Sequence, residues 1–193
     1  MENPFRNLRF KSVSKSRPPF SVKWIREKLT METLDGLNPE ARDVLLAMVN
    51  TGCRLSEICG LQPDEIRLDA EVPHIVIQDN AARALKTPSS HRVMPLVGVS
   101  LEAIARHPEG FPRYSGKDGV SATVNKYLRT NGLLETPAHS AYSLRHAFED
   151  RMLAISLPDR LAAELMGHSV SRERYGSGPS LAQKLEAVLR LAI

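Results

Sequence analysis

The chain has 193 residues, of which 42% are hydrophobic and 25% charged, and its formal net charge at pH 7 is +4. This length suits one domain with a substantial hydrophobic core, and the composition is typical of a soluble globular protein. No apolar run reaches the ~20 residues that a membrane-spanning helix needs, and the basic N-terminus lacks the apolar segment of a signal peptide.

Positive charge is concentrated at the N-terminus. Residues 1–28 contain eight lysines and arginines against two glutamates, so the rest of the chain is net negative. Prolines at positions 4, 18 and 19 indicate that residues 1–20 form a linker or arm. The charge of this arm is compatible with a polyanion partner and with a solvated linker alike.

Helix signals begin directly after the arm. Ser21 is placed to cap a helix that runs to about Met31. The stretch "LNPEARDVLLAMVNTG" predicts a second helix, with Asn38 as its N-cap, Pro39 at the first helical position and Gly52 after its end. A further helical piece begins almost at once in "CRLSEICGL".

Two segments rich in β-forming residues follow. The stretches "HIVIQ" (74–78) and "HRVMPL" (91–96) predict strands separated by "ARALKTPSS", and hence a small antiparallel sheet at about 73–95. Helices are expected beyond it at roughly 99–106, 118–131, 142–155, 158–166 and 180–192. The chain is therefore predicted to be mainly helical with one small sheet.

The two cysteines of the chain, Cys53 and Cys59, lie close together in one apolar helical stretch. With no other cysteine present, neither a disulfide framework nor a zinc site is expected. We interpret both as buried thiols in a reducing, cytoplasmic compartment.

Several polar side chains in the first half of the chain are candidates for chemistry. Arg54 follows a helix stop, and Glu57 lies on the same helix face, where it can orient the guanidinium. A plain surface ion pair explains the same spacing. Lys86 is expected at a hairpin tip, and no other lysine occurs between Lys28 and Lys117. A solvated turn lysine is the simpler interpretation of that position.

The second half of the chain adds three candidates. The stretch "YSLRHAF" (142–148) places Arg145 inside an apolar run that should form the buried start of a helix. Arginine is seldom buried without a partner, so this side chain either pairs with a carboxylate or binds an anion. Further on, "LMGHS" ends a helix at Gly167 and presents His168, and "RERYGSG" places Tyr175 in a polar segment. Taken singly, these two residues could be a helix cap and a surface aromatic.

The histidines raise the alternative of a metal site. The nearest candidates for a ligand set are His139, His146, Glu149 and His168, but they lack the H-x-x-x-H spacing that places two ligands on one helix face. We therefore expect no metal. The chain also contains no glycine-rich phosphate loop, serine nucleophile elbow or paired-carboxylate pattern, and we expect no cofactor.

The order of these pieces along the chain is more informative than any one of them. The chain contains, in succession, "TGCRLSEICGL", "LKTPSSHRVMPL", "YSLRHAFEDRM", "LMGHS" and "RYG". Over about residues 20–193 it resembles the catalytic domain of the tyrosine recombinases, the phage-integrase family. The resemblance implies a mainly α fold with a small antiparallel three-stranded sheet (α+β). It divides the chain into a basic arm, residues 1–20, and a catalytic domain, residues 21–193.

The same resemblance implies a set of site residues. The positions that match the family's catalytic residues are Arg54, Lys86, Arg145, His168 and the nucleophile Tyr175, with Glu57 as the acidic residue that supports the first arginine. In the implied reaction the tyrosine oxygen attacks a DNA phosphodiester and leaves a 3′-phosphotyrosine and a free 5′-hydroxyl. Two guanidinium forks suit the negative charge that gathers on the nonbridging oxygens. The lysine is the candidate acid for the leaving 5′-oxygen.

This sequence departs from the family pattern at Tyr142, where the family usually has His or Lys. A phenol can donate a hydrogen bond to a phosphate but is a poor base at neutral pH, so the proton acceptor for Tyr175 stays open. His139 can substitute only if the backbone bends there, and His146 is a candidate supporting residue beside Arg145. The family's N-terminal helical domain has no counterpart here, so the chain resembles an excised or truncated catalytic fragment, or the tail end of a longer integrase.

We therefore predict site-specific, integrase-like recombination with double-stranded DNA as substrate, in the cytoplasm of a bacterium or encoded by a phage, and with no membrane partner. The last helix has an apolar face, which packs either on its own domain or, as in the family, on a neighbouring protomer. The second arrangement implies a homotetramer on two DNA sites. The alternatives are a catalytically impaired DNA-binding fragment or regulatory relative, and a relaxing topoisomerase with the same chemistry.

Overall fold

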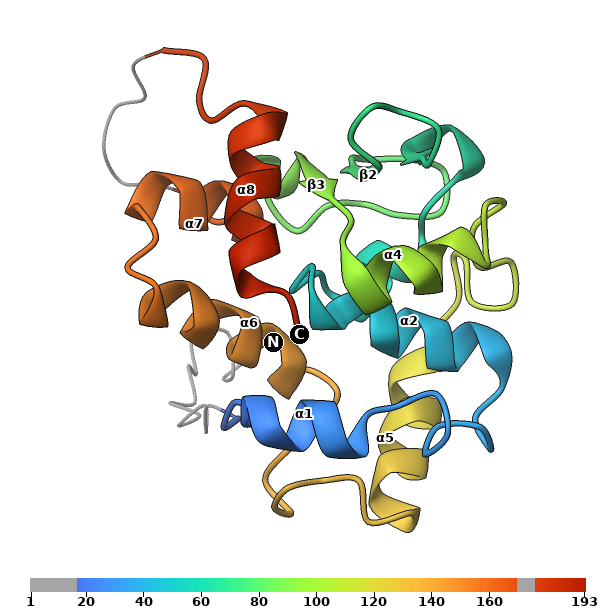
Figure 1. The fold of residues 1–193 in the computed structure, drawn as a ribbon. Coiled ribbons are helices and arrows are strands. Elements are labelled where there is room, and N and C mark those ends of the chain that lie inside the picture. The colour runs from blue at the N-terminus through green and yellow to red at the C-terminus, as the bar shows by residue number, and fades with distance from the viewer. Residues whose placement is uncertain (1–16, 170–175) are drawn as a thin grey trace, which may run out of the picture.

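The computed structural model describes residues 17–169 and 176–193 (Figure 1). Most of the predicted arm and the predicted nucleophile Tyr175 therefore lie outside the described residues. The helices are α1 (Val22–Lys28), α2 (Pro39–Val49), α3 (Leu55–Cys59), α4 (Gly98–Ala105), α5 (Val120–Thr130), α6 (Ser143–Ala154), α7 (Asp159–Met166) and α8 (Leu181–Leu191). The strands are β1 (Ile66–Arg67), β2 (His74–Ile77) and β3 (Arg92–Pro95), with short 3-10 helices η1 (Pro63–Glu65) and η2 (Pro88–Ser90). The predicted α+β class with a small antiparallel three-stranded sheet is confirmed.

The predicted helix caps form as the sequence indicated. The Ser21 hydroxyl accepts a hydrogen bond from the Trp24 amide, and the Asn38 side chain accepts one from the Ala41 amide. Helix α1 ends at Lys28, short of the expected Met31. The reason is local, because the hydroxyls of Thr30 and Thr33 bond each other's backbone N–H groups and compete with the helix.

The sheet has the order β1-β2-β3, with both pairs antiparallel. Ile75 and Ile77 alternate with half-buried neighbours along β2 and are fully buried, which is the pattern of a strand with one face on the core. In the adjacent strand, Met94 pairs with Ile75 and Arg92 pairs with Ile77. The register therefore places an arginine on the same buried face as these apolar side chains.

Helix α2 is the centre of the core. Its residues from Val44 to Val49 are almost completely shielded from solvent, and it contacts α3, α4, α5 and α6. Figure 1 shows α2 in the middle of the molecule, with α1 and α5 on one side and the sheet on the other. This second half of the helix has no solvent face, which explains why residues 44–49 are apolar all round.

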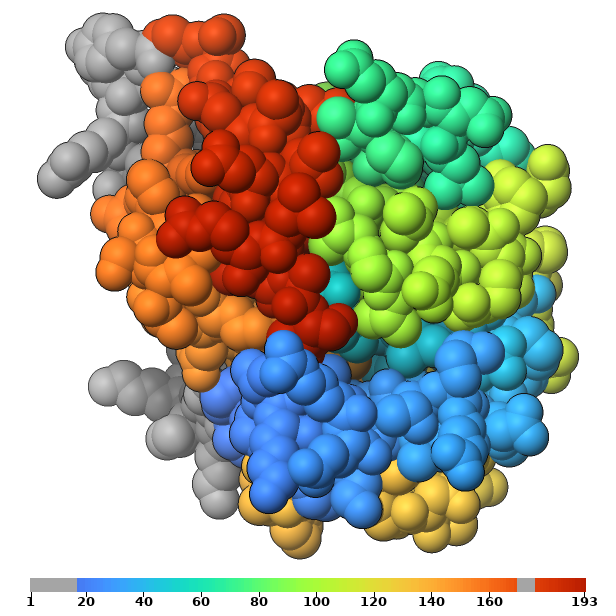
Figure 2. Space-filling view, in the orientation of Figure 1, coloured from blue at the N-terminus to red at the C-terminus, as the bar shows by residue number. Residues whose placement is uncertain are grey.

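Helix α8 packs on its own domain. It lies against β3 and α6, and the space-filling view shows its surface seated between the α6–α7 surface and the segment around β3 (Figure 2). The Asn50 side chain exchanges two hydrogen bonds of 3.2 Å with the backbone of Ile193, and Arg151 donates to the Leu191 carbonyl at 2.6 Å. These contacts attach the end of the chain to the C-terminal end of α2.

Among the helices in the described ranges, none is long and apolar enough to cross a membrane.

Candidate functional site

Arg54 is positioned by the turn that ends α2. Gly52 adopts a left-handed conformation (φ +59°), and a Cβ there would lie 2.5 Å from the Phe148 ring, so only glycine fits. The chain then turns directly into α3, for which Arg54 is the N-cap residue. Its side chain stays partly open to solvent, with 21% of its surface exposed. The sequence "TGCR" thus delivers a guanidinium to the surface at the start of a short helix.

Glu57 holds Arg54 by both its backbone and its side chain. One carboxylate oxygen accepts from the Arg54 guanidinium at 2.5 Å, and the other accepts from the Arg54 amide at 2.8 Å. The carboxylate itself is buried. The predicted pairing is therefore present, but it is a buried arrangement and not the surface ion pair that the spacing also allowed.

Arg92 is the second partner of Glu57 and was not singled out from the sequence. Its guanidinium donates to the two Glu57 oxygens at 2.8 and 3.2 Å, to the Ser90 carbonyl at 2.9 Å and to the Cys53 sulfur at 3.3 Å. Burial by itself raises the pKa of Glu57, but the hydrogen bonds and charge of Arg92, together with those of Arg54, lower it to about 2. Glu57 is therefore a carboxylate at any physiological pH.

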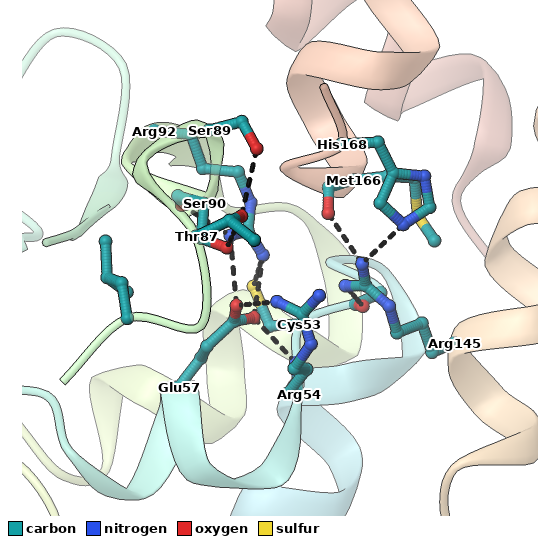
Figure 3. Close-up of polar contacts among 12 residues, drawn as sticks. Cys53, Arg54, Glu57, Thr87, Ser89, Ser90, Arg92, Arg145, Met166 and His168 are labelled. Atoms are coloured by element: carbon teal, nitrogen blue, oxygen red, sulfur yellow. Dashed lines mark hydrogen bonds and ion pairs between the residues drawn. The ribbon is translucent and has the colours of Figure 1, made fainter. Parts of the chain in front are cut away.

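Arg145, in the first turn of α6, is 2% exposed. Its guanidinium donates to the Gly52 carbonyl at 2.8 Å and to the Met166 carbonyl at 2.6 Å (Figure 3). Among residues 17–169 and 176–193, no carboxylate lies within ion-pair distance of it. The sequence left open whether Arg145 pairs with a carboxylate or binds an anion. The described part of the chain supplies no carboxylate partner. Burial and the nearby charge of Arg54 lower the pKa of Arg145, and the charge of Glu57 opposes this shift without cancelling it.

His168 lies directly beside Arg145. Helix α7 ends in a left-handed Gly167 (φ +64°), and the next residue places its Nε2 atom 3.1 Å from an Arg145 nitrogen. Arginine can only donate, so this Nε2 accepts and the ring proton sits on Nδ1. Burial, followed by the charge of Arg145, lowers the pKa of His168 below its usual 6.5. The neutral imidazole is therefore the favoured form.

The structure brings together Arg54, Glu57, Arg145 and His168, and does not bring Lys86 into that cluster. Lys86 is exposed in the loop between β2 and β3, and its side chain makes no hydrogen bond or ion pair to any other described residue. The base of this loop is fixed by a buried ion pair of 2.9 Å between Arg83 and Glu65. Tyr175 lies outside the described residues.

Tyr142 borders the site, and its ring stacks edge to face with that of His146, with centroids 5.2 Å apart. Tyr142 also lines a groove of about 520 Å³ together with Arg54, Arg17 and Lys117. These three cationic side chains outnumber the one carboxylate, Asp118, among the described residues of the lining. Polar side chains of α5 and of the turn before α6 complete the groove wall.

His139 is part of the core and not of the site. Its Nδ1 accepts from the Thr136 amide at 3.1 Å, so its Nε2 carries the proton and donates to the Pro19 carbonyl at 3.0 Å. The ring also stacks on Phe20 with centroids 4.7 Å apart. The expectation that His139 could replace the family's usual His or Lys is therefore wrong in this structure. Within the described residues there is no group of three or more metal-ligating side chains in reach of one ion.

Comparison with known proteins gives consistent results. The tyrosine recombinase XerC of Azotobacter vinelandii is 32% identical over 149 residues, which cover 72% of this chain and 50% of that protein. The integrase of mycobacterium phage Brujita superposes with a TM-score of 0.64 at 21% identity, over 96% of this chain and 61% of that one. The Tn1549 transposon integrase in complex with transposon right end DNA superposes with a TM-score of 0.58 at 18% identity, over 88% of this chain and 64% of that one.

The chain spans about half the length of the curated relative it matches. The two superpositions show that the fold is the one these integrases share. The sequence model of the phage integrase family matches residues 27–173, which include α2, the sheet, α6 and α7 with all the side chains gathered in the site. The chain therefore belongs to the phage integrase family.

Proposed function

We propose that this chain cleaves and rejoins double-stranded DNA in site-specific recombination, through a 3′-phosphotyrosine intermediate. The observation that carries the proposal is the pair of guanidinium groups of Arg54 and Arg145. They come from different elements, they are close enough for their charges to interact, and Arg145 has no carboxylate partner among the described residues. Such a pair is suited to a phosphate that carries extra negative charge in its transition state.

The roles of the individual residues follow from this assignment. The Tyr175 oxygen gives up its proton to a base, attacks phosphorus and forms the new P–O bond, while the bond from phosphorus to the 5′-oxygen breaks. Arg54 and Arg145 bind the nonbridging oxygens. His168 donates one further hydrogen bond once a phosphate replaces its contact with Arg145 and its Nε2 carries a proton. Lys86, on its exposed loop, supplies the proton that the leaving 5′-oxygen needs.

The groove beside Arg54 supports a path for the DNA backbone. Arg17, Arg54 and Lys117 line it together with the Tyr142 side chain and one carboxylate, Asp118, so its lining is net cationic. We propose that the basic arm, residues 1–20, extends this phosphate contact, and that residues 21–193 form the catalytic domain. Phosphate contacts of this kind make affinity strongly dependent on salt.

We further propose that the chain acts where DNA is accessible, in the cytoplasm of a bacterium, and that four copies assemble on two DNA sites. In the single chain, α8 packs on its own domain. Assembly therefore requires either a protein surface other than α8 or the release of α8 from the contacts with Asn50 and Arg151.

The direct test is covalent capture of DNA. A randomised duplex library with a nick near the middle is incubated with the protein, and adducts that survive denaturation are isolated and sequenced. The expected result is an enriched sequence joined through its 3′-phosphate to Tyr175, with no adduct from the Tyr175→Phe variant. Binding without an adduct would favour a catalytically impaired DNA-binding fragment. Adducts with no enriched sequence would favour a relaxing topoisomerase.

A further inference from the structure

We propose that Arg92 is a positioning residue of the site, whose buried guanidinium fixes the Glu57 carboxylate in the orientation that aligns Arg54. This inference rests on the proposed function, since Arg54 is assigned there to the scissile phosphate. Arg92 itself cannot contact DNA, because its side chain has no solvent exposure. Any effect on cleavage must therefore pass through another residue.

The hydrogen bonds around Glu57 form a closed set. One carboxylate oxygen accepts from Arg54 at 2.5 Å and from Arg92 at 3.2 Å, and the other accepts from the Arg54 amide and from Arg92, each at 2.8 Å. An ionised carboxylate has about four acceptor positions, so all of them are used. Figure 3 shows the side chains of Arg92 and Arg54 both reaching the Glu57 carboxylate, Arg92 from above and Arg54 from the right.

This arrangement requires an arginine at position 92. A guanidinium presents two parallel N–H groups that match the two oxygens of a carboxylate, whereas an ammonium is a point charge without that fork. With one bond from position 92 in place of two, Glu57 would keep its two bonds from Arg54, but its carboxylate would be held less firmly on the side away from Arg54. The Arg54 guanidinium would then be less well fixed towards the groove.

Arg92 also contacts the loop that carries Lys86 and the turn that carries His168. It donates to the Ser90 carbonyl at 2.9 Å, and a Cβ on Gly167 would lie 2.8 Å from its Nη1. The loop contact is one hydrogen bond to a neutral acceptor, while the Glu57 contact is two hydrogen bonds to a charged one. Charge-assisted bonds are roughly twice as strong as neutral ones, so the main route runs through Glu57 to Arg54.

The charged groups around Glu57 make the pH dependence of cleavage a test of this role. A residue that acted only through packing would not change that pH dependence. The ionisable groups that face it are Arg54 from the start of α3, Arg92 from β3, Cys53 before α3 and, further away, Arg145 from α6. Without Arg92 the buried carboxylate keeps one close cation in place of two, so its pKa rises from about 2. The cleavage rate of an Arg92 variant should then fall at mildly acidic pH, because Glu57 becomes protonated. In the parent chain Glu57 stays ionised at that pH.

The experiment measures single-turnover cleavage of a substrate whose bridging 5′-oxygen is replaced by sulfur, so that slow variants remain measurable. Arg92→Met should cleave about 10²-fold more slowly than the parent chain, the size expected when a catalytic group is misplaced by about 1 Å, with DNA affinity little changed. Arg92→Lys should lose less. Arg151→Met, which removes a buried arginine bonded to the Val49 and Leu191 carbonyls, serves as the control for lost stability and should cleave normally.

Two results would overturn the inference. The first is that Arg92→Met slows cleavage by the same factor when Arg54 has already been replaced by alanine. A residue that acts through Arg54 should have no further effect in that variant. The second is full rescue of Arg92→Met by the sulfur substrate, which would assign Arg92 to the Lys86 loop.

A DNA-free measurement separates this inference from the proposed function. In the parent chain, nitrogen NMR of the Arg54 guanidinium should give distinct signals for its two terminal nitrogens, because rotation is restricted. In Arg92→Met, and to a lesser degree in Arg92→Lys, these signals should merge. If the parent chain never cleaves DNA, the proposed function fails while this test still applies. An equally ordered Arg54 in both Arg92 variants would refute the positioning role.

Discussion

The Nε2 atom of His168 lies 3.1 Å from Arg145 and accepts a hydrogen bond from it. Both residues are proposed to bind the same phosphate. Without DNA, however, Arg145 donates its hydrogen bond to His168. His168 cannot donate from this nitrogen while it accepts. For His168 to donate to a phosphate from Nε2, this bond must break and Nε2 must gain a proton, either by a shift of the ring proton from Nδ1 or by protonation of the ring.

The pKa of His168 is expected below 6.5 in the DNA-free chain, because burial and the charge of Arg145 both disfavour the imidazolium. NMR titration of the ring should show this, with Arg145→Ala moving the pKa back towards 6.5. Since the unfolded chain binds the proton more readily, the contribution of His168 to the free energy of unfolding declines as the pH falls below 6.5. A ring that titrates at 6.5 or above in the parent chain would contradict the contact with Arg145.

Gly167→Ala should destabilise the domain more than an ordinary left-handed glycine does. The new Cβ meets an Arg92 nitrogen at 2.8 Å and the Ser90 backbone at 3.1 Å, in addition to the backbone strain at φ +64°. Gly132 has the same φ of +64°, and a Cβ added to it would meet nothing within 4 Å, so Gly132→Ala is the matched control. Left-handed backbone costs alanine roughly 1–2 kcal/mol, and the crowding at Gly167 adds ~1–3 kcal/mol.

Thermal unfolding of the two variants measures the difference. The Gly167→Ala midpoint should lie several degrees below that of Gly132→Ala, since ~1 kcal/mol corresponds to roughly 2–4 °C for a domain of this size. Equal midpoints would mean that α7 does not pack against Arg92 as described.

Lys86→Ala should slow the cleavage of ordinary DNA by roughly 10²–10⁴-fold, the usual contribution of a general acid. Sulfur in place of the bridging 5′-oxygen should restore the rate, because a thiolate leaves without a proton. Lys117→Ala is the control, since this lysine lines the groove and should affect DNA binding without rescue by sulfur. A lack of rescue for Lys86→Ala would make Lys86 a phosphate or base contact.

Tyr142 should act as a phosphate ligand and not as the proton acceptor. Tyr142→Phe then loses one hydrogen bond to a charged group, about 1.5–3 kcal/mol of transition-state stabilisation, as measured by single-turnover cleavage. Tyr142→His should keep the activity or raise it. If the histidine variant is folded but inactive, the alignment of the start of α6 with the family pattern is wrong.

Local signals predicted the elements well. The helices expected at about 99–106, 118–131, 142–155, 158–166 and 180–192 are all present within a residue or two. The caps at Ser21 and Asn38 depend on hydrogen bonds to the backbone three residues further on, a spacing that a sequence displays directly. Strand β1 has only two residues, too short to give a periodic pattern, and it forms because β2 offers it a partner.

The site was predictable where its contacts are local. Glu57 lies three residues after Arg54, so their pairing could be read from the spacing alone. Arg92 meets Glu57 across 35 residues, and only the β3 register makes that contact. One signal was available, because Arg92 lies two residues before Met94 and so shares the strand face expected to be buried, where an arginine needs a partner. No such signal existed for the carbonyl partners of Arg145 or for the ring contacts of His139.

The three arginines around the site have consequences for how robust this protein can become. Arg54 and Arg92 share one carboxylate, Glu57, and the charges of these two arginines both disfavour the charge on Arg145. A domain under selection for durability alone would replace one of them with an apolar side chain. A bound phosphate would relieve this repulsion. The arginines therefore lower the stability of the free domain and raise its affinity for phosphate. Engineering for heat resistance should therefore begin at α8 or the α6–α7 turn and leave these arginines in place.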